Sequence, residues 1–393
     1  MDDLGPPAAT AQPASGKNGP QEPGASSPAR GRGPLALMRG HEQVLYGNDP
    51  ASGLRCIIAV HSTALGPALG GTRFMAYASE EAALRDVLRL SRAMTLKAAC
   101  AELDVGGGKA VILGDPASAK TEALLRAYGR MVASLGGRYV TACDMGTEPA
   151  DMALVRRETR WATGADPKEG GSGDSGVMTA LGVHVGLRAC AQRAFGDPDL
   201  SGVHVAIQGV GKVGRRLAEL LSAAGARLTI ADIDTAAADA VAQQLGAQMV
   251  DAEEILRVPC EVISPNAVGG VLNDDTVPAL RCRVVAGAAN NQLATAAHGE
   301  ALHRAGILYA PDHVINAGGL IQVADELHPD GGDPERVRAA VERIEPRLTA
   351  LFALADAEGT SPAVAAMSMA ERRIAEVGRL RSLWLPNGGP GRS

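Results

Sequence analysis

Strand-like and helix-like runs alternate along the first third of the chain. Residues 54–61 and 138–142 are short runs of apolar and β-branched side chains, which is typical of buried strands. Residues 79–94 repeat their apolar positions at helical spacing, and Ser79 is placed to cap the first backbone N–H groups. Residues 121–135 predict a second helix. Such alternation favours an α/β domain.

Two lysines stand near the middle of this region. Lys97 should lie at or just past the end of helix 79–94, and Lys109 follows a predicted glycine loop at 106–108. A buried strand should follow at 110–113. A lysine at the mouth of a strand would be partly removed from water, which would lower its pKa and let it act as a base. This stretch alone leaves the alternative of a solvated lysine in a surface turn.

Two further segments of the first part bear on the fold. Residues 65–73 are rich in glycine and turn residues, so we predict a turn there. Asp144 follows the strand at 138–142, which is a common position for a functional acid in an α/β sheet. The alternative is that Asp144 caps the helix that begins near Thr147 or Pro149.

The second half contains a glycine turn in the context that a dinucleotide requires. Strand 203–208 runs into the turn, a helix follows at 215–224, and the next strand, 227–231, ends at Asp232. The turn consists of Gly209, Val210, Gly211, Lys212, Val213 and Gly214. Gly211 would let a pyrophosphate approach the helix N-terminus, where free N–H groups attract anions.

Asp232 indicates which dinucleotide fits. It lies 23 residues beyond Gly209 and would accept hydrogen bonds from ribose hydroxyls while repelling a 2′-phosphate. We therefore predict NAD rather than NADP, against the alternative of a glycine turn without a ligand.

The remaining pattern completes a two-domain α/β prediction, with a Rossmann-type doubly wound parallel sheet in the second domain. Strands at 260–264, 283–287 and 307–310 each end in a polar or glycine loop, and such loops gather at the carboxyl edge of a parallel sheet. Helices are predicted at 177–195, 336–354 and 361–380. The predicted boundaries are a disordered leader at 1–34, a first domain at 35–165, a second at 166–355, and C-terminal helices at 356–393 packing back on the first domain.

Composition narrows the function classes. The 393 residues carry a net charge of −6, which gives no reason to expect nucleic-acid binding, and no apolar run could span a membrane. The six cysteines are scattered without metal-binding spacing and fit reduced thiols of a cytoplasmic protein. Four histidines also lack ligand spacing, so we expect no metal site and place them at the surface or at helix caps: His298, His303, His313 and His328.

Seven motifs occur in one order and at spacings that resemble the glutamate, leucine, phenylalanine and valine dehydrogenase family, and above all its leucine and valine branch. They lie at residues 66–73, 94–97, 106–112, 141–147, 209–214, 289–293 and 316–319. The resemblance implies reversible oxidative deamination of an L-amino acid with NAD. It also implies an interdomain cleft, with the substrate held by the first domain, which also serves oligomerisation, and with the cofactor on the second.

The same resemblance implies roles for the charged residues. Lys97 matches the lysine that holds the substrate carboxylate, and Lys109 matches the base that activates water. We expect burial and the neighbouring Lys97 to lower the pKa of Lys109. Asp144 matches the carboxylate that moves protons at the amino group. Thr179 and Asn290 match groups that orient the nicotinamide.

The positions that match the side-chain pocket are all uncharged. They are Leu69, Gly70, Met94, Ala142, Leu320 and Val323. A γ-carboxylate would find no partner there, which argues against glutamate and favours leucine, valine or isoleucine. A phenylalanine or other aromatic dehydrogenase is the alternative, and a non-catalytic NAD-binding regulatory protein is a third possibility. Family members imply a homo-oligomer.

Overall fold

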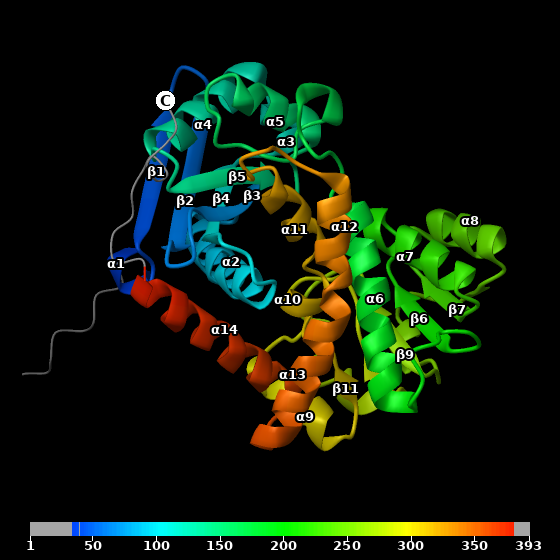
Figure 1. Ribbon diagram of the computed structural model, residues 1–393. Coiled ribbons are helices and arrows are strands. Elements are labelled where there is room, and N and C mark those ends of the chain that lie inside the picture. The colour runs from blue at the N-terminus through cyan, green and yellow to red at the C-terminus, as the bar shows by residue number, and fades with distance from the viewer. Residues whose placement is uncertain (1–33, 39, 381–393) are drawn as a thin grey trace, which may run out of the picture.

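The computed structural model describes residues 34–38 and 40–380. Nearly all of the predicted leader, and the part of the predicted C-terminal helical region after residue 380, lie outside the described residues. The described chain forms two sheets, each covered by helices, which divide it into a first and a second domain (Figure 1). No helix in this described part is both long and apolar enough to cross a lipid bilayer.

The first sheet has five strands in the order β1-β2-β4-β3-β5. The pairs β1/β2 and β2/β4 are antiparallel, whereas β3 runs parallel to both β4 and β5. The strands are β1 (Gln43–Asp49), β2 (Leu54–Ser62), β3 (Ala68–Met75), β4 (Gly106–Leu113) and β5 (Tyr139–Cys143).

The second sheet has six parallel strands in the order β11-β10-β9-β6-β7-β8. This is the doubly wound order of dinucleotide-binding domains, so the predicted fold class is confirmed. The strands are β6 (His204–Gln208), β7 (Arg227–Ala231), β8 (Gln248–Met249), β9 (Val262–Pro265), β10 (Val284–Val285) and β11 (Leu308–Tyr309).

Helices cover both faces of each sheet. The helices that accompany the first sheet are α1 (Pro34–Leu37), α2 (Glu80–Cys100), α3 (Pro116–Ala119), α4 (Glu122–Ser134) and α5 (Pro149–Arg156). Those of the second domain are α6 (Gly176–Phe195), α7 (Lys212–Ala223), α8 (Thr235–Leu245), α9 (Ala296–Arg304), α10 (Asp312–Ile315) and α11 (Gly318–Asp325). Short 3₁₀ turns lie at Pro167–Glu169, Ile255–Arg257 and Val277–Ala279.

Three C-terminal helices complete the described chain: α12 (Pro334–Glu342), α13 (Ile344–Glu358) and α14 (Pro362–Leu380). The last of them, α14, packs against α2 of the first domain and against α13 and α9 (Figure 1).

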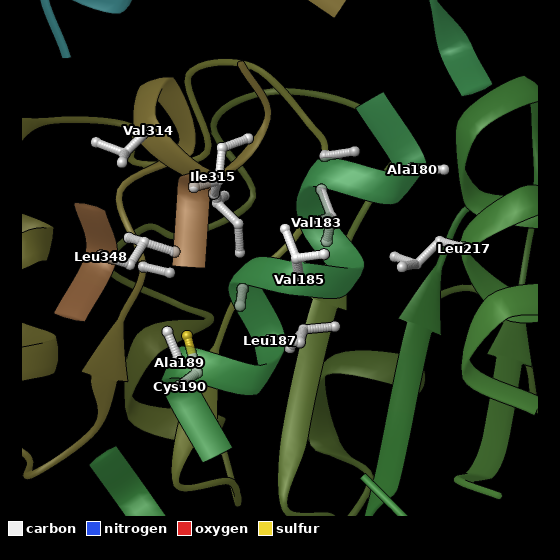
Figure 2. Packing of buried hydrophobic residues seen from close by; sticks show 14 of the residues in the cluster. Ala180, Val183, Val185, Leu187, Ala189, Cys190, Leu217, Val314, Ile315 and Leu348 are labelled. Carbon is white, nitrogen blue, oxygen red and sulfur yellow. The ribbon is translucent and has the colours of Figure 1, made fainter. Parts of the chain in front are cut away.

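Helix α6 forms the centre of the largest apolar core. Its Val183 and Leu187 are almost fully buried, and they lie among side chains of α7, α10 and α13 such as Leu217, Ile315 and Leu348 (Figure 2). Because α6 contacts several helices besides the second sheet, its apolar residues are spread around the helix and do not form one stripe.

The structure corrects two predictions in the first sheet. Residues 68–75 form strand β3, between β4 and β5, and are not a turn. Residues 106–108 belong to strand β4 and are not a loop. A Cβ built on Gly70 would lie 1.8 Å from the carbonyl oxygen of Gly108, and one built on Gly107 would lie 2.1 Å from the backbone nitrogen of Thr95 on α2. These glycines allow backbones to approach closely within regular structure.

The predicted helix at 336–354 is also wrong, because the chain forms two helices there. Helix α12 ends at Glu342, and α13 begins at Ile344. Pro346 explains the break, since it has no N–H to donate to the carbonyl of Glu342 and its ring would collide with that carbonyl. Proline is tolerated in the first turn of α13.

We predict that Gly107→Ala lowers the free energy of unfolding by about 1–3 kcal/mol, because the new methyl group would push α2 away from β4. Gly332→Ala is the control, because a Cβ at that exposed position would come no closer than 3.8 Å to its nearest neighbour, Glu326. Chemical denaturation of both variants measures the difference. Equal free energies of unfolding would contradict the proposed role of the close approach.

Candidate functional site

A cavity of about 820 Å³ lies between the two domains. It is lined by residues of β3, β4, β5 and α2 on one side and of α6, α7 and α11 on the other. The predicted interdomain cleft is therefore present. It brings together thirteen of the predicted site residues: Leu69, Gly70, Met94, Lys97, Lys109, Ala142, Asp144, Thr179, Lys212, Val213, Asn290, Leu320 and Val323.

Lys109 lies within β4, not at its mouth, and its side chain is only 9% exposed. Its Nζ is 2.5 Å from Oδ2 of Asp144, which directly follows β5. The same oxygen lies 3.5 Å from Nε of Arg73, whose Nη1 pairs with Asp86 at 3.0 Å. One carboxylate thus faces two cations at the wall of the cavity.

This environment keeps Asp144 ionised. Burial by itself would raise the pKa of the carboxyl group, but Lys109 and Arg73 outweigh burial and lower the pKa to about 2. The capping alternative for Asp144 is wrong, because Glu148 forms the capping box of α5 with Asp151. The Asp144 backbone N–H instead donates to Thr147 Oγ1 at 2.9 Å, which fixes the turn after β5.

Lys97 lies in the last turn of α2 and reaches across the cleft. Its Nζ donates to Oδ1 of Asn290 at 2.8 Å, and Asn316 Nδ2 donates to the same oxygen at 3.0 Å. Burial lowers the pKa of Lys97 to about 8; Lys109 adds to this decrease, whereas Asp312 and Asp144 oppose it. Asn290 therefore contacts the predicted carboxylate-binding lysine directly.

Sequence reasoning missed Arg73 and Asn316 as members of the site. Both belong to motifs that carried the family resemblance, at 66–73 and 316–319, and that position in a motif was the available signal. Asn316 is almost fully buried and also donates to the carbonyl of Ala288 at 2.9 Å. It holds the loop that presents Asn290.

The apolar end of the cavity is formed by residues of both domains. Leu69 from β3 and Val140 from β5 pack in one cluster with Leu320 and Val323 from α11. Met94 packs at the edge of this cluster, and Gly70 and Ala142 line the cavity next to it. The side chains of Leu69, Met94, Ala142, Leu320 and Val323 that line this end are apolar, so it suits an apolar substrate side chain.

The glycine turn has the geometry that a pyrophosphate needs. Gly209 has a φ of +92°, and a Cβ on Gly214 would lie 1.9 Å from the Gly209 carbonyl oxygen. A Cβ on Gly211, by contrast, would meet no atom within 4 Å, so the side from which a ligand would approach is open. Gly211 is the N-cap of α7 and offers no side-chain cap to its free N–H groups.

Asp232 stands at the end of β7 beside this turn. Its Oδ2 accepts a hydrogen bond from the backbone N–H of Val210 at 2.7 Å, and its Oδ1 accepts one from Asp234. The turn residues Gly209, Val210, Gly211 and Gly214 and Asp232 do not line the cavity, but Lys212 and Val213 join the turn to it. Thr179 lines the cavity from α6, and its hydroxyl donates to the Ser175 carbonyl at 2.9 Å.

The histidines of the second domain differ from expectation in one case. His298 takes part in the capping box of α9, as predicted. His313 is not a surface residue; it is paired with Asp312 at 3.3 Å. Burial by itself would lower the pKa of His313, but Asp312 and Cys100 together outweigh burial and raise this pKa to about 10. Within residues 34–38 and 40–380, no group of three or more His, Cys, Asp or Glu side chains is arranged to hold a metal ion.

Comparison with known proteins places this site in a family. Residues 41–161 match the model of the Glu/Leu/Phe/Val dehydrogenase dimerisation domain. Residues 170–241 and 229–381 match that of Glutamate/Leucine/Phenylalanine/Valine dehydrogenase.

Individual relatives agree with the family models. The chain is 54% identical to a valine dehydrogenase of Streptomyces coelicolor, over 86% of this chain and 93% of that protein. It is 48% identical to a leucine dehydrogenase of Geobacillus stearothermophilus, over 88% and 94%. The crystal structure of L-tryptophan dehydrogenase from Nostoc punctiforme superposes with a TM-score of 0.74 at 42% identity, covering 87% of this chain and 98% of that one.

The match spans both domains and contains the seven motifs. The chain therefore belongs to the glutamate, leucine, phenylalanine and valine dehydrogenase family of amino-acid dehydrogenases, as its motifs predicted.

Proposed function

We propose that the protein catalyses the reversible NAD-dependent oxidative deamination of a branched-chain L-amino acid to a 2-oxo acid and ammonium. The observation that carries the proposal is the convergence of Lys97, the Lys109–Asp144 pair and an apolar pocket in one cleft beside an open glycine turn. When bound, NAD would supply the acceptor for the hydride that leaves the substrate α-carbon.

The two domains would hold the reactants from opposite sides. The ammonium group of Lys97 binds the substrate carboxylate, and Asn290 keeps that ammonium group in place from the second domain. The apolar cluster takes the substrate side chain. Gly211 and the first turn of α7 bind the pyrophosphate, Asp232 binds the adenosine ribose, and Thr179 faces the nicotinamide end of the cleft. Holding both reactants in a fixed geometry supplies much of the rate.

Proton movements are assigned to the pair at the cavity wall. Asp144 is ionised and can take a proton from the amino group of the substrate. After oxidation of the substrate, a water molecule attacks the imino carbon. Lys109 takes a proton from that water as the neutral amine, after its ammonium group has released a proton to solvent. Arg73 does not reach the substrate in this scheme; it holds Asp144 in place.

The apolar pocket and the relatives support a branched-chain substrate. A γ-carboxylate in this pocket would be buried without a partner, which would be costly. The curated relatives at 45–54% identity are valine and leucine dehydrogenases. The L-tryptophan dehydrogenase structure keeps an aromatic substrate as the second candidate.

We also propose that the protein is a homo-oligomer in the cytoplasm. The matched family model of the first domain is named a dimerisation domain, and a structural neighbour from Thermus thermophilus is a hetero-hexameric glutamate dehydrogenase. Light scattering measures the assembly directly.

A substrate panel tests the activity. We expect NADH to form with L-valine, L-leucine or L-isoleucine at a higher kcat/KM than with L-phenylalanine, L-tryptophan or L-glutamate. NADP should be a poor replacement for NAD because Asp232 would repel its 2′-phosphate. Absorbance of the reduced cofactor is the measurement. Tight NADH binding without turnover of any amino acid would instead indicate a regulatory protein.

Replacement of Lys109 by alanine tests the base. We expect Lys109→Ala to lower kcat by about 10²–10⁴-fold, because a positioned base contributes that much. The Kd of NADH should change little. Lys168→Ala, at an exposed lysine, is the control and should match the wild type. Substantial activity in Lys109→Ala would refute the assignment.

The charge of Lys97 predicts a pH dependence of 2-oxo acid binding. Below its pKa of about 8, Lys97 is charged and attracts the carboxylate; as the pH rises through about 8, the proton and the attraction are lost. The Kd of the 2-oxo acid for the enzyme–NADH complex, followed by NADH fluorescence, should be constant below this pH and rise above it. In Lys97→Arg any remaining affinity should persist to higher pH, because a guanidinium stays charged. A wild-type Kd that is flat well above pH 8 would contradict this role.

A further inference from the structure

Helix α11 contacts both the side-chain pocket and the segment through which the chain passes from the first domain to the second. It lies between the first sheet and α12 (Figure 1). Its residues Leu320 and Val323 line the apolar end of the pocket together with Leu69 and Ala142 of the first sheet. The width of the pocket therefore depends on where α11 sits relative to that sheet.

The N-terminal end of α11 is fixed by close contact with α6. A Cβ on Gly318 would lie 1.9 Å from the Met178 carbonyl oxygen, and one on Gly319 would lie 2.6 Å from Thr179 Oγ1. This end of the helix has no space in which to shift toward α6. Only the other end, near Glu326, could change the angle of the helix.

Two side chains one helical turn apart hold the C-terminal end of α11 against residues 164 and 172. Oε1 of Glu326 accepts hydrogen bonds from Gly164 N at 2.9 Å, from Ser172 N at 2.8 Å and from the Ser172 hydroxyl. Gln322 Nε2 donates to the Ser172 carbonyl at 2.6 Å. Gln322 and Glu326 thus grip the segment that leaves the first sheet, and we call these contacts the α11 clamp.

The gripped segment is itself attached to the sheet. Ala162 forms a bridge with Thr141 of β5, and Thr163 N donates to the Thr141 carbonyl at 2.8 Å. Ala142, the next residue of β5, lines the same cavity as Leu320 and Val323 of α11. Glu326 is therefore linked, through the backbone of residues 163–164 and their hydrogen bonds, to the strand that carries Ala142.

We propose that Glu326 is a positioning residue that sets the width of the amino-acid side-chain pocket, by fixing α11 against the edge of the first sheet. A single carboxylate oxygen that accepts three hydrogen bonds is a strong anchor, because bonds to an ionised acceptor are stronger than neutral ones. Glu326 is not among the residues that line the cavity, so it acts through Leu320 and Val323. The proposal rests on the proposed function, because it concerns the same pocket.

The test compares selectivity, not activity alone. The readout is the ratio of kcat/KM for the preferred branched-chain amino acid to that for L-phenylalanine. In Glu326→Ala we expect this ratio to fall by about tenfold, since pocket size alone discriminates by about 10–200-fold per methylene. The KM of the amino acid should rise while the KM of NAD stays unchanged. Glu326→Gln keeps an acceptor oxygen and should remain within about twofold of the wild-type ratio.

Two further variants make the result decisive. Ser172→Ala removes only the hydroxyl bond and should lower the ratio in the same direction by less, which keeps the test usable if Glu326→Ala fails to fold. Glu376→Ala, at an exposed glutamate on α14, is the control. A ratio unchanged in Ser172→Ala and in any folded Glu326→Ala would overturn the proposal, whatever their melting temperatures. So would a loss in Glu326→Gln as large as in Glu326→Ala. A wild type that turns over no branched-chain amino acid would instead refute the proposed function.

Discussion

The close approach of α2 to β4 is the constraint on which the active-site geometry depends. Lys97 is carried by the helix and Lys109 by the strand, and the distance between the two elements is set where Gly107 meets the backbone of Thr95. A side chain of any size at this point would separate the elements that carry the two lysines. The three glycines of β4 therefore serve the site through packing, even though only Lys109 supplies chemistry.

The charges of the cleft follow from this packing. Lys97 and Lys109 line the same cavity, so Lys109 disfavours the charge of Lys97, and carboxylates nearby oppose this effect. Asp144 pairs with two cations, Lys109 and Arg73. Asp312 opposes part of the decrease that burial causes in the pKa of Lys97. The result is an ionised acid at the wall and a less strongly basic lysine at the place where the substrate carboxylate would bind.

Much of this was predictable from the sequence, and the failures have physical causes. The glycine turn, the acid that follows it and the order of the motifs predicted the fold class and the family, because those features are local in sequence. The inner strand β3, which lies between β4 and β5, was missed, because glycines that permit close packing look like turn residues when their neighbours in space are unknown. Arg73 and Asn316 were missed as site residues because their importance arises only from contacts with residues distant in the chain, such as Asp144 and Asn290.

The burial of α6 has a consequence for how the protein is made. Its apolar side chains are covered partly by α13, which is synthesised long after α6 has left the ribosome. During that interval the second domain has all its strands but lacks the helix that covers α6, so an apolar surface stays exposed to other nascent chains. The folding of the second domain is therefore completed only when the C-terminal helices have been synthesised. A chain truncated before α13 would be prone to aggregation, even though it would contain every residue assigned to the cleft.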